Sequence, residues 1–69
     1  MTKVRPAVEV ISQRIEAMPI NKSELARRIG IDYELLRRSL NNERVLKGDE
    51  LVNICVILGI TIDDFIAED

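Results

Sequence analysis

The side chains of this chain suit polar recognition better than catalysis. The sequence contains no histidine and a single cysteine, Cys55, which excludes imidazole catalysis, the usual zinc-site spacings and an internal disulfide. It also offers no glycine-rich phosphate loop and no nucleophile beside a base, so we expect no enzyme, no bound metal, no cofactor and no small-molecule ligand. Residues 32–38, in contrast, hold two arginines, a glutamate and a tyrosine. Guanidinium and carboxylate groups can form paired hydrogen bonds, so this segment could recognise a polar partner.

The charges are divided unevenly along the chain. The net charge is −2, which taken alone argues against binding phosphates. All ten basic residues lie before residue 48 beside six acids, which gives +4 there, and the remainder holds six acids and no base, which gives −6. Such asymmetry is typical of a protein with one side facing nucleic acid, and equally of a solvated surface with an acidic tail.

The composition predicts a small globular protein. Apolar residues make up 46% of the 69-residue chain, enough to supply the well-filled core that so short a domain needs. No segment approaches the roughly 20 consecutive apolar residues of a membrane span, and the first residues lack the pattern of a secretory signal. We therefore expect one domain over residues 1–69, located in the cytoplasm and without a membrane partner.

Apolar spacing predicts an all-α, compact fold of five helices. Pro6 suits the first turn of a helix, and Pro19 disfavours helical geometry at the residue before it. Gly30 stands just past a helix end, where a left-handed conformation is common, and Thr61 and Asp64 have the spacing of a capping box. No segment shows the alternation of a strand. The expected helices cover about residues 6–17, 22–29, 33–40, 49–58 and 62–67.

Residues 21–41 have the organisation of a helix-turn-helix unit. Asn21 and Glu24 have capping-box spacing at the start of the first helix, and Asp32 stands at the cap position of the second. A three-residue turn joins the two helices, and Ala26 is small where the second helix must pass closely over the first. A helical corner without any ligand would need the same packing, so that interpretation stays open.

These residues resemble the Cro and phage-repressor helix-turn-helix family, also called lambda-repressor-like or XRE-type domains. The resemblance is carried by LARRIGIDYELLRRSLNNER at residues 25–44 and by LGIT at residues 58–61, followed by DDF. It covers nearly the whole chain and implies a DNA-binding domain. The departures from the family pattern are Ser39 in place of an apolar residue, Asn42 in place of glycine, and Lys47 with Gly48 in place of the usual cap.

The resemblance also assigns roles in reading DNA. In this fold the second helix of the unit, here about residues 33–40, enters the major groove of double-stranded DNA with its N-terminal turns first. The base-reading positions of the family fall on Tyr33, Glu34, Arg37 and Arg38. Arginine can donate twice to guanine, glutamate can accept from cytosine, and tyrosine can contact a thymine methyl group. We expect Arg38 and then Tyr33 to contribute most, whereas Glu34 either meets a cytosine or repels phosphates.

A second set of basic residues is expected to contact the DNA backbone. Lys22 begins the first helix of the unit, where the exposed amides also attract a phosphate. Arg44 and Lys47 lie in the loop after the second helix. We assign Lys22, Arg44 and Lys47 to phosphate positioning, which adds affinity without sequence information. Arg27 and Arg28 are explained at least as well as solvated surface charges.

The predicted helix at residues 49–58 is apolar on more than one side. One stripe, which includes Cys55, faces the core, and Val52 and Val56 form a second. Either neighbouring helices cover this second stripe or another subunit does, and we favour the subunit. A homodimer, formed at least on DNA, would hold two reading helices about 34 Å apart.

Two functions of different classes remain open. The first is sequence-specific DNA binding as a transcriptional regulator, of the repressor kind. The second is a protein-interaction module on a degenerate helix-turn-helix scaffold, which the net acidity, Glu34 and the apolar excess of residues 49–58 favour. Duplex binding that falls steeply with salt and prefers some sequences would distinguish the first from the second.

Overall fold

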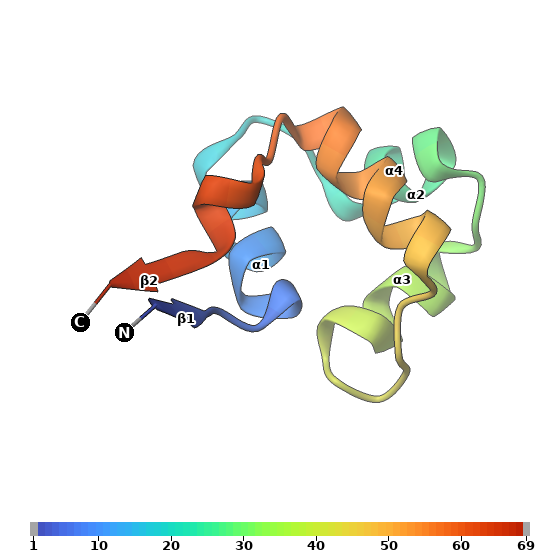
Figure 1. The fold of residues 1–69 in the computed structure, drawn as a ribbon. Helices are drawn as coiled ribbons and strands as arrows, with labels where there is room; N and C mark the ends of the chain where they lie inside the picture. Colours follow the sequence, from blue (N-terminus) through green and yellow to red (C-terminus); the bar gives the residue numbers. More distant parts are fainter. Residues whose placement is uncertain (1, 69) are drawn as a thin grey trace.

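The computed structural model describes residues 2–68, which form four α-helices, a short 3₁₀ turn and a pair of terminal strands (Figure 1). The helices are α1 (Ala7–Ala17), α2 (Lys22–Ile29), α3 (Tyr33–Leu40) and α4 (Gly48–Leu58). Each of them begins and ends within one residue of its predicted bounds. The expectation of a small, mainly helical fold is therefore confirmed.

The prediction of a fifth helix at residues 62–67 is wrong, and so is the expected absence of strands. Ile62–Phe65 form a single 3₁₀ turn, η1, and the chain then continues as strand β2 (Ile66–Glu68). This strand pairs antiparallel with β1 (Thr2–Val4), so that Lys3 lies opposite Ala67. The Arg5 N–H extends the pairing by donating to the Phe65 carbonyl at 2.7 Å. The backbone after η1 therefore bonds to the first residues of the chain instead of continuing a helix.

All four helices contribute to one hydrophobic core. Ile11 of α1, Leu25 of α2, Leu36 of α3 and Ile54 of α4 have no exposed surface. Full burial of such a side chain stabilises the fold by roughly 1.5 to 3 kcal/mol. Since Leu36 packs in the same cluster as the residues from the other helices, the core fixes the orientation of α3.

The turn between α2 and α3 follows from two small residues. Gly30 adopts a left-handed conformation with a φ of 88°, which strains any residue that carries a Cβ. The N–H groups of Gly30 and Ile31 both donate to the Ala26 carbonyl, at 2.9 and 3.2 Å, and close the end of α2. Ala26 is almost completely buried, as the close passage of the two helices requires.

The predicted helix caps are only partly correct. The Glu24 N–H donates to Asn21 Oδ1 at 2.7 Å, which confirms Asn21 as the cap of α2. Glu24 does not complete the capping box, because its carboxylate accepts from Arg27 and Arg28 instead. Asp32 precedes α3 but forms no side-chain cap bond. Both acids lie on the protein surface, where arginine or water competes with the backbone N–H groups.

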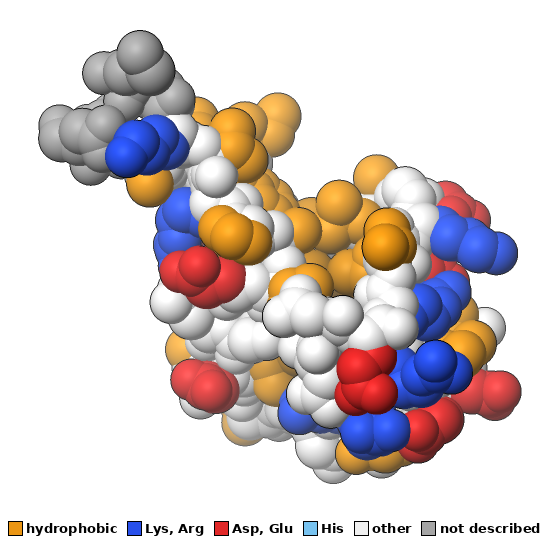
Figure 2. All heavy atoms as spheres, turned by 90° about the horizontal axis from the view of Figure 1, so that it is seen from below, with side chains coloured by type: hydrophobic (Ala, Val, Ile, Leu, Met, Phe, Trp, Pro, Cys, Tyr) orange, Lys and Arg blue, Asp and Glu red, His pale blue; other side chains and the backbone are white. Residues whose placement is uncertain are grey.

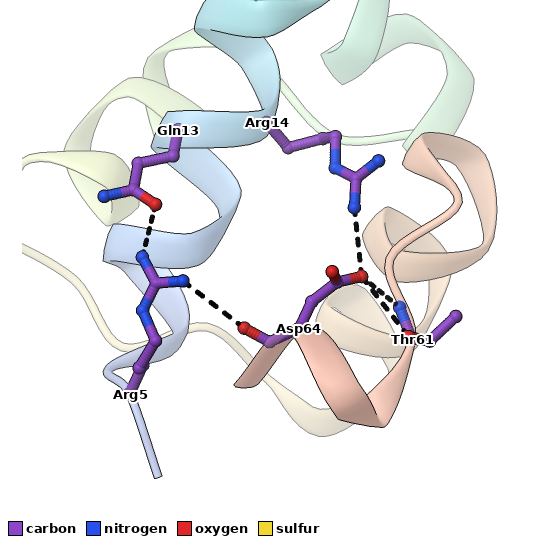
Figure 3. A network of polar contacts seen from close by, with 5 residues as sticks. All are labelled: Arg5, Gln13, Arg14, Thr61 and Asp64. Atoms are coloured by element: carbon purple, nitrogen blue, oxygen red, sulfur yellow. Dashed lines mark hydrogen bonds and ion pairs between the residues drawn. The ribbon is translucent and has the colours of Figure 1, made fainter. Parts of the chain in front are cut away.

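A polar network ties both ends of the chain to α1 (Figure 3). The Asp64 carboxylate accepts from the Arg14 guanidinium at 3.0 Å and from the Thr61 N–H at 2.8 Å. Arg5 reaches across from the start of the chain to donate to the Asp64 carbonyl at 3.5 Å and to the Gln13 side chain. The Thr61 N–H and the nearby Arg14 charge lower the pKa of Asp64. The capping interaction predicted for Thr61 and Asp64 is thus present, although it begins a 3₁₀ turn.

Candidate nucleic-acid interface

Helix α3 buries one side and exposes the other. At about 100° per residue, Glu34 and Arg38 point away from the core and lie one helical turn apart. Tyr33, which is 45% exposed, and the half-buried Arg37 occupy one flank of that side. The helix thus brings the four predicted base-reading residues to one face. Its buried residues, on the opposite face, are Leu36, Ser39 and Leu40.

An ion pair joins two of these four residues. Arg37 donates to both carboxylate oxygens of Glu34, from Nε at 3.2 Å and from a terminal guanidinium nitrogen to the other oxygen. These hydrogen bonds lower the pKa of Glu34 and raise that of Arg37. Among the described residues Arg38 has no ion pair or hydrogen-bond partner for its side chain, and it is exposed. Arg38 is therefore the basic side chain on this face that is free to bind a ligand.

A second acid pairs with the arginines of α2. Glu24 accepts from Arg27 at 2.6 Å and from Arg28 at 3.1 Å, and both hydrogen bonds lower the pKa of Glu24. Lys22, two residues before Glu24, is exposed and makes no such pair within the described part of the chain. On the side away from the terminal strands, Figure 2 shows basic and acidic side chains interleaved. This surface is mixed in charge rather than uniformly basic.

Arg44 lies in a polar network that connects α3 to α4. Its guanidinium donates to Ser39 Oγ at 2.9 Å and to Glu50 Oε2 at 2.9 Å. The other oxygen of Glu50 accepts from the Lys47 N–H at 3.0 Å and so caps α4. Only 19% of the Arg44 side chain and 11% of the Glu50 side chain are exposed. Arg44 therefore links the end of α3 to the start of α4.

The burial of this network depends on complete pairing. Ser39 is fully enclosed, and within the described residues no buried side-chain nitrogen or oxygen lacks a hydrogen-bond partner. Arg44, followed by the Lys47 N–H, lowers the pKa of Glu50, so its carboxylate stays ionised next to the guanidinium. Sequence reasoning did not identify Ser39 and Glu50 as the partners of Arg44. The available signal was a serine at a core position of α3 and an acid three residues after Lys47, the N-cap of α4.

Lys47 is placed differently from Arg44 although both belong to the same loop. Its side chain is exposed and has no ion-pair partner among the described residues. Its backbone N–H is held by Glu50, which fixes where the side chain begins. Of the three residues predicted to contact phosphates, Lys22 and Lys47 thus present free charges, whereas Arg44 is engaged inside the protein.

The comparison with protein families decides the identity of this arrangement. The family model of the Cro/C1-type helix-turn-helix DNA-binding domain matches residues 10–67, which is most of the chain. The chain belongs to the Cro/C1-type domain family. The resemblance seen in the sequence is confirmed. Searches of curated proteins and of solved structures returned no significant match.

Membership of the Cro/C1-type family makes the chain a DNA-binding domain, of a kind that is generally not enzymatic.

The described residues contain no group of acidic or cysteine side chains that could hold a metal ion. Cys55 is half-buried beside the core, and burial raises the pKa of its thiol. Within residues 2–68 no helix combines the length and the apolar character needed to cross a bilayer.

Helix α4 of this Cro/C1-type domain leaves an apolar stripe uncovered. Ile54 and Leu58 face the core, whereas Val52 and Val56, on the outer side, are 60% and 75% exposed. Neither α1 nor η1 covers them, which was the alternative to a subunit contact. These two valines lie one turn apart and together form an exposed apolar patch.

Proposed function

We propose that this Cro/C1-type domain is a sequence-specific transcriptional regulator that binds double-stranded DNA with α3 in the major groove. The observation that carries the proposal is the exposed face of α3, where Arg38 stands unpaired beside the Glu34–Arg37 pair and Tyr33 lies on the flank. Arginine can donate to both acceptors of guanine, and this is the commonest specific contact to a base. The rigid core behind Leu36 keeps this face in one orientation.

The proposed contacts divide into base reading and backbone positioning. Tyr33, Glu34, Arg37 and Arg38 read bases. Lys22 and Lys47 contact phosphates, and the free N–H groups at the start of α2 assist Lys22. We propose that Arg44 acts indirectly, because its hydrogen bonds to Ser39 and Glu50 hold the loop that carries Lys47.

The exposed stripe of α4 supports a homodimer that forms at least on DNA. In a two-fold dimer the same patch serves both subunits, and contact between the Val52 and Val56 stripes would remove four exposed valines from water. Two α3 helices would then be spaced to read half-sites about 34 Å apart. An acidic domain with an apolar patch would also suit the alternative, a protein-interaction module. On either proposal the domain works in the cytoplasm.

Selection of bound duplexes from a random pool tests the proposed function. Enrichment of one sequence, with affinity that falls as salt rises, is the expected result. A selected site with two-fold symmetry supports the dimer, and Val52→Ser combined with Val56→Ser should then weaken binding to the full site more than to a half-site. A pool that shows no enrichment, together with no salt-dependent binding to any duplex, would favour the protein-interaction module.

A further inference from the structure

The centre of the exposed face of α3 carries an acid. Glu34 points directly away from the core, one turn before Arg38, and 61% of its side chain is exposed. A carboxylate in this place faces the phosphates and bases of a duplex bound to α3. If affinity alone mattered, an acid would be the least suitable residue here, because DNA is a polyanion.

Because Glu34 is paired with Arg37, it reduces the attraction of this face for DNA by more than its own negative charge would. Arg37 uses Nε and a terminal nitrogen on Glu34, which is the same two-donor edge that would otherwise bind guanine or a phosphate. The carboxylate therefore acts as an internal substitute for a phosphate. Of the two arginines on this face, Arg38 alone is unoccupied in the free protein.

The major groove offers a carboxylate few partners. Guanine presents two acceptors, thymine presents an acceptor and a methyl group, and adenine presents an acceptor next to its donor. Cytosine presents its N4 amino group as a donor. A glutamate held in the groove is consequently satisfied by cytosine and unfavourably placed against guanine and thymine.

We propose that Glu34 determines the sequence specificity of this domain by weakening its binding to non-cognate DNA. The inference depends on the proposed DNA-binding function. On non-cognate DNA, Glu34 keeps Arg37 from phosphates and repels the duplex, so binding stays weak. On the cognate site, a cytosine N4 amino group satisfies Glu34, and Arg38 supplies the main attractive contact. Specificity then arises from a penalty against wrong sites as well as from contacts to the right one.

The test compares Glu34→Gln with Glu24→Gln. Both variants remove one negative charge that pairs with arginine, but Glu24 lies on α2 and not on the exposed face of α3. Gln keeps the size of the side chain and can form paired hydrogen bonds with adenine. Each variant and the parent chain undergo duplex selection from a random pool and titration with a random-sequence duplex, and thermal unfolding confirms that all three are folded.

For Glu34→Gln we expect the selected site to change from cytosine to adenine at one position, with a preference of about 5- to 150-fold at that position. Affinity for the random duplex should rise, and the slope of log K against log salt should steepen by up to about 0.9, because Arg37 becomes free for a phosphate. Glu24→Gln should leave the selected sequence unchanged. Selection of the same site by the parent and by Glu34→Gln would overturn the inference while leaving DNA binding intact. Failure of the parent to enrich any sequence would instead overturn the proposed function, and the inference with it.

Discussion

Two glutamate–arginine pairs of this domain have the same chemistry and different surroundings. Glu50 and Arg44 are 11% and 19% exposed and join the loop after α3 to α4. Glu34 and Arg37 are 61% and 38% exposed and lie within one turn of α3. The first pair is enclosed with a buried serine, and the second faces the solvent where DNA is proposed to bind. Burial thus separates a pair that holds two elements of the fold together from one that is open to solvent.

The physical difference between the pairs is the cost of removing one partner. A charge enclosed by protein loses its hydration, so its remaining stabilisation comes from the opposite charge and the hydrogen bonds around it. An exposed charge that loses its partner is rehydrated, and such pairs contribute little to stability. Equivalent substitutions in the two pairs should therefore give different results, in stability for one and in DNA recognition for the other.

The largest expected effect is the loss of stability in Glu50→Ala. The variant leaves Arg44 enclosed without its carboxylate and removes the cap of the Lys47 N–H. A fully buried pair would lose about 3 to 5 kcal/mol, and because this one retains some exposure we expect about 2 to 3 kcal/mol. The melting temperature should fall by roughly 10 °C or more in a domain of this size. Thermal unfolding followed by circular dichroism measures the shift.

Glu34→Ala is the matched control for that measurement, since it breaks the exposed pair and should leave the melting temperature nearly unchanged. Replacing both partners of the enclosed pair, in Arg44→Met with Glu50→Met, should recover part of the loss because neither charge is then left alone, although Ser39 and the Lys47 N–H still lose their partners. Equal melting temperatures for Glu50→Ala and Glu34→Ala would show that burial does not distinguish the two pairs.

The next effect concerns Arg38, the arginine of α3 that is not in an ion pair. Arg38→Ala should weaken binding to the selected duplex by about 1 to 3 kcal/mol, because a paired contact to guanine is lost. Binding to a random duplex should change much less. Arg28→Ala, which removes the same charge from α2, serves as the control and should change the binding to both duplexes equally. Fluorescence anisotropy titrations at one salt concentration provide the six affinities of the parent and the two variants, and equal losses for Arg38→Ala on both duplexes would contradict its base-reading role.

The sequence predicted the elements whose signals are local. Asn21 caps α2 through the residue three positions later, and Gly30 ends the same helix through its own conformation. The exposure of Glu34 and Arg38 likewise follows from helical periodicity within α3. In each case the interacting groups lie within one or two turns of the chain, so residue type and spacing were enough to place them.

The features that the sequence did not reveal depend on contacts between distant residues. Phe65 ends a turn instead of extending a helix because its carbonyl bonds to Arg5, from the opposite end of the chain. The position of Arg44 in the loop, on which its predicted contact with a phosphate rests, gives no indication of its hydrogen bonds inside the protein. Ser39 and Glu50 approach it only after α3 and α4 have packed on the same core. A buried polar network needs the tertiary structure before its members can be recognised.

Lowering the pH should also distinguish the two pairs, by a smaller change in the free energy of unfolding. Arg44 lowers the pKa of Glu50 and Arg37 lowers that of Glu34, so both contribute stability above the ordinary value near 4.5. That stability is lost as the pH falls below this value and through the lowered pKa of the folded state. Glu50→Gln should flatten the acid limb of stability against pH more than Glu34→Gln does.

Salt provides the control for the acid experiment. At 1 M salt the screening length is about 3 Å, so the contribution of the exposed Glu34 should largely disappear. The contribution of Glu50 should persist, because its pair is enclosed. Glu24 and Asp64 also have lowered pKa values, and they supply the acid sensitivity that remains in both variants. Acid limbs of identical shape for the two glutamine variants at high salt would contradict the difference in burial.

The smallest effect tests whether Arg44 stays inside the protein when DNA binds. Lys47→Gln removes a free charge and should lower the slope of log K against log salt by about 0.9, the release of one counterion. Arg44→Gln removes the same charge from the same loop, yet it should leave this slope unchanged at temperatures where the variant is folded. A lower slope in both variants would mean that Arg44 leaves Glu50 for a phosphate. The enclosed pair would then exchange partners as the exposed pair is proposed to do, and burial in the free domain would not determine which pairs meet DNA.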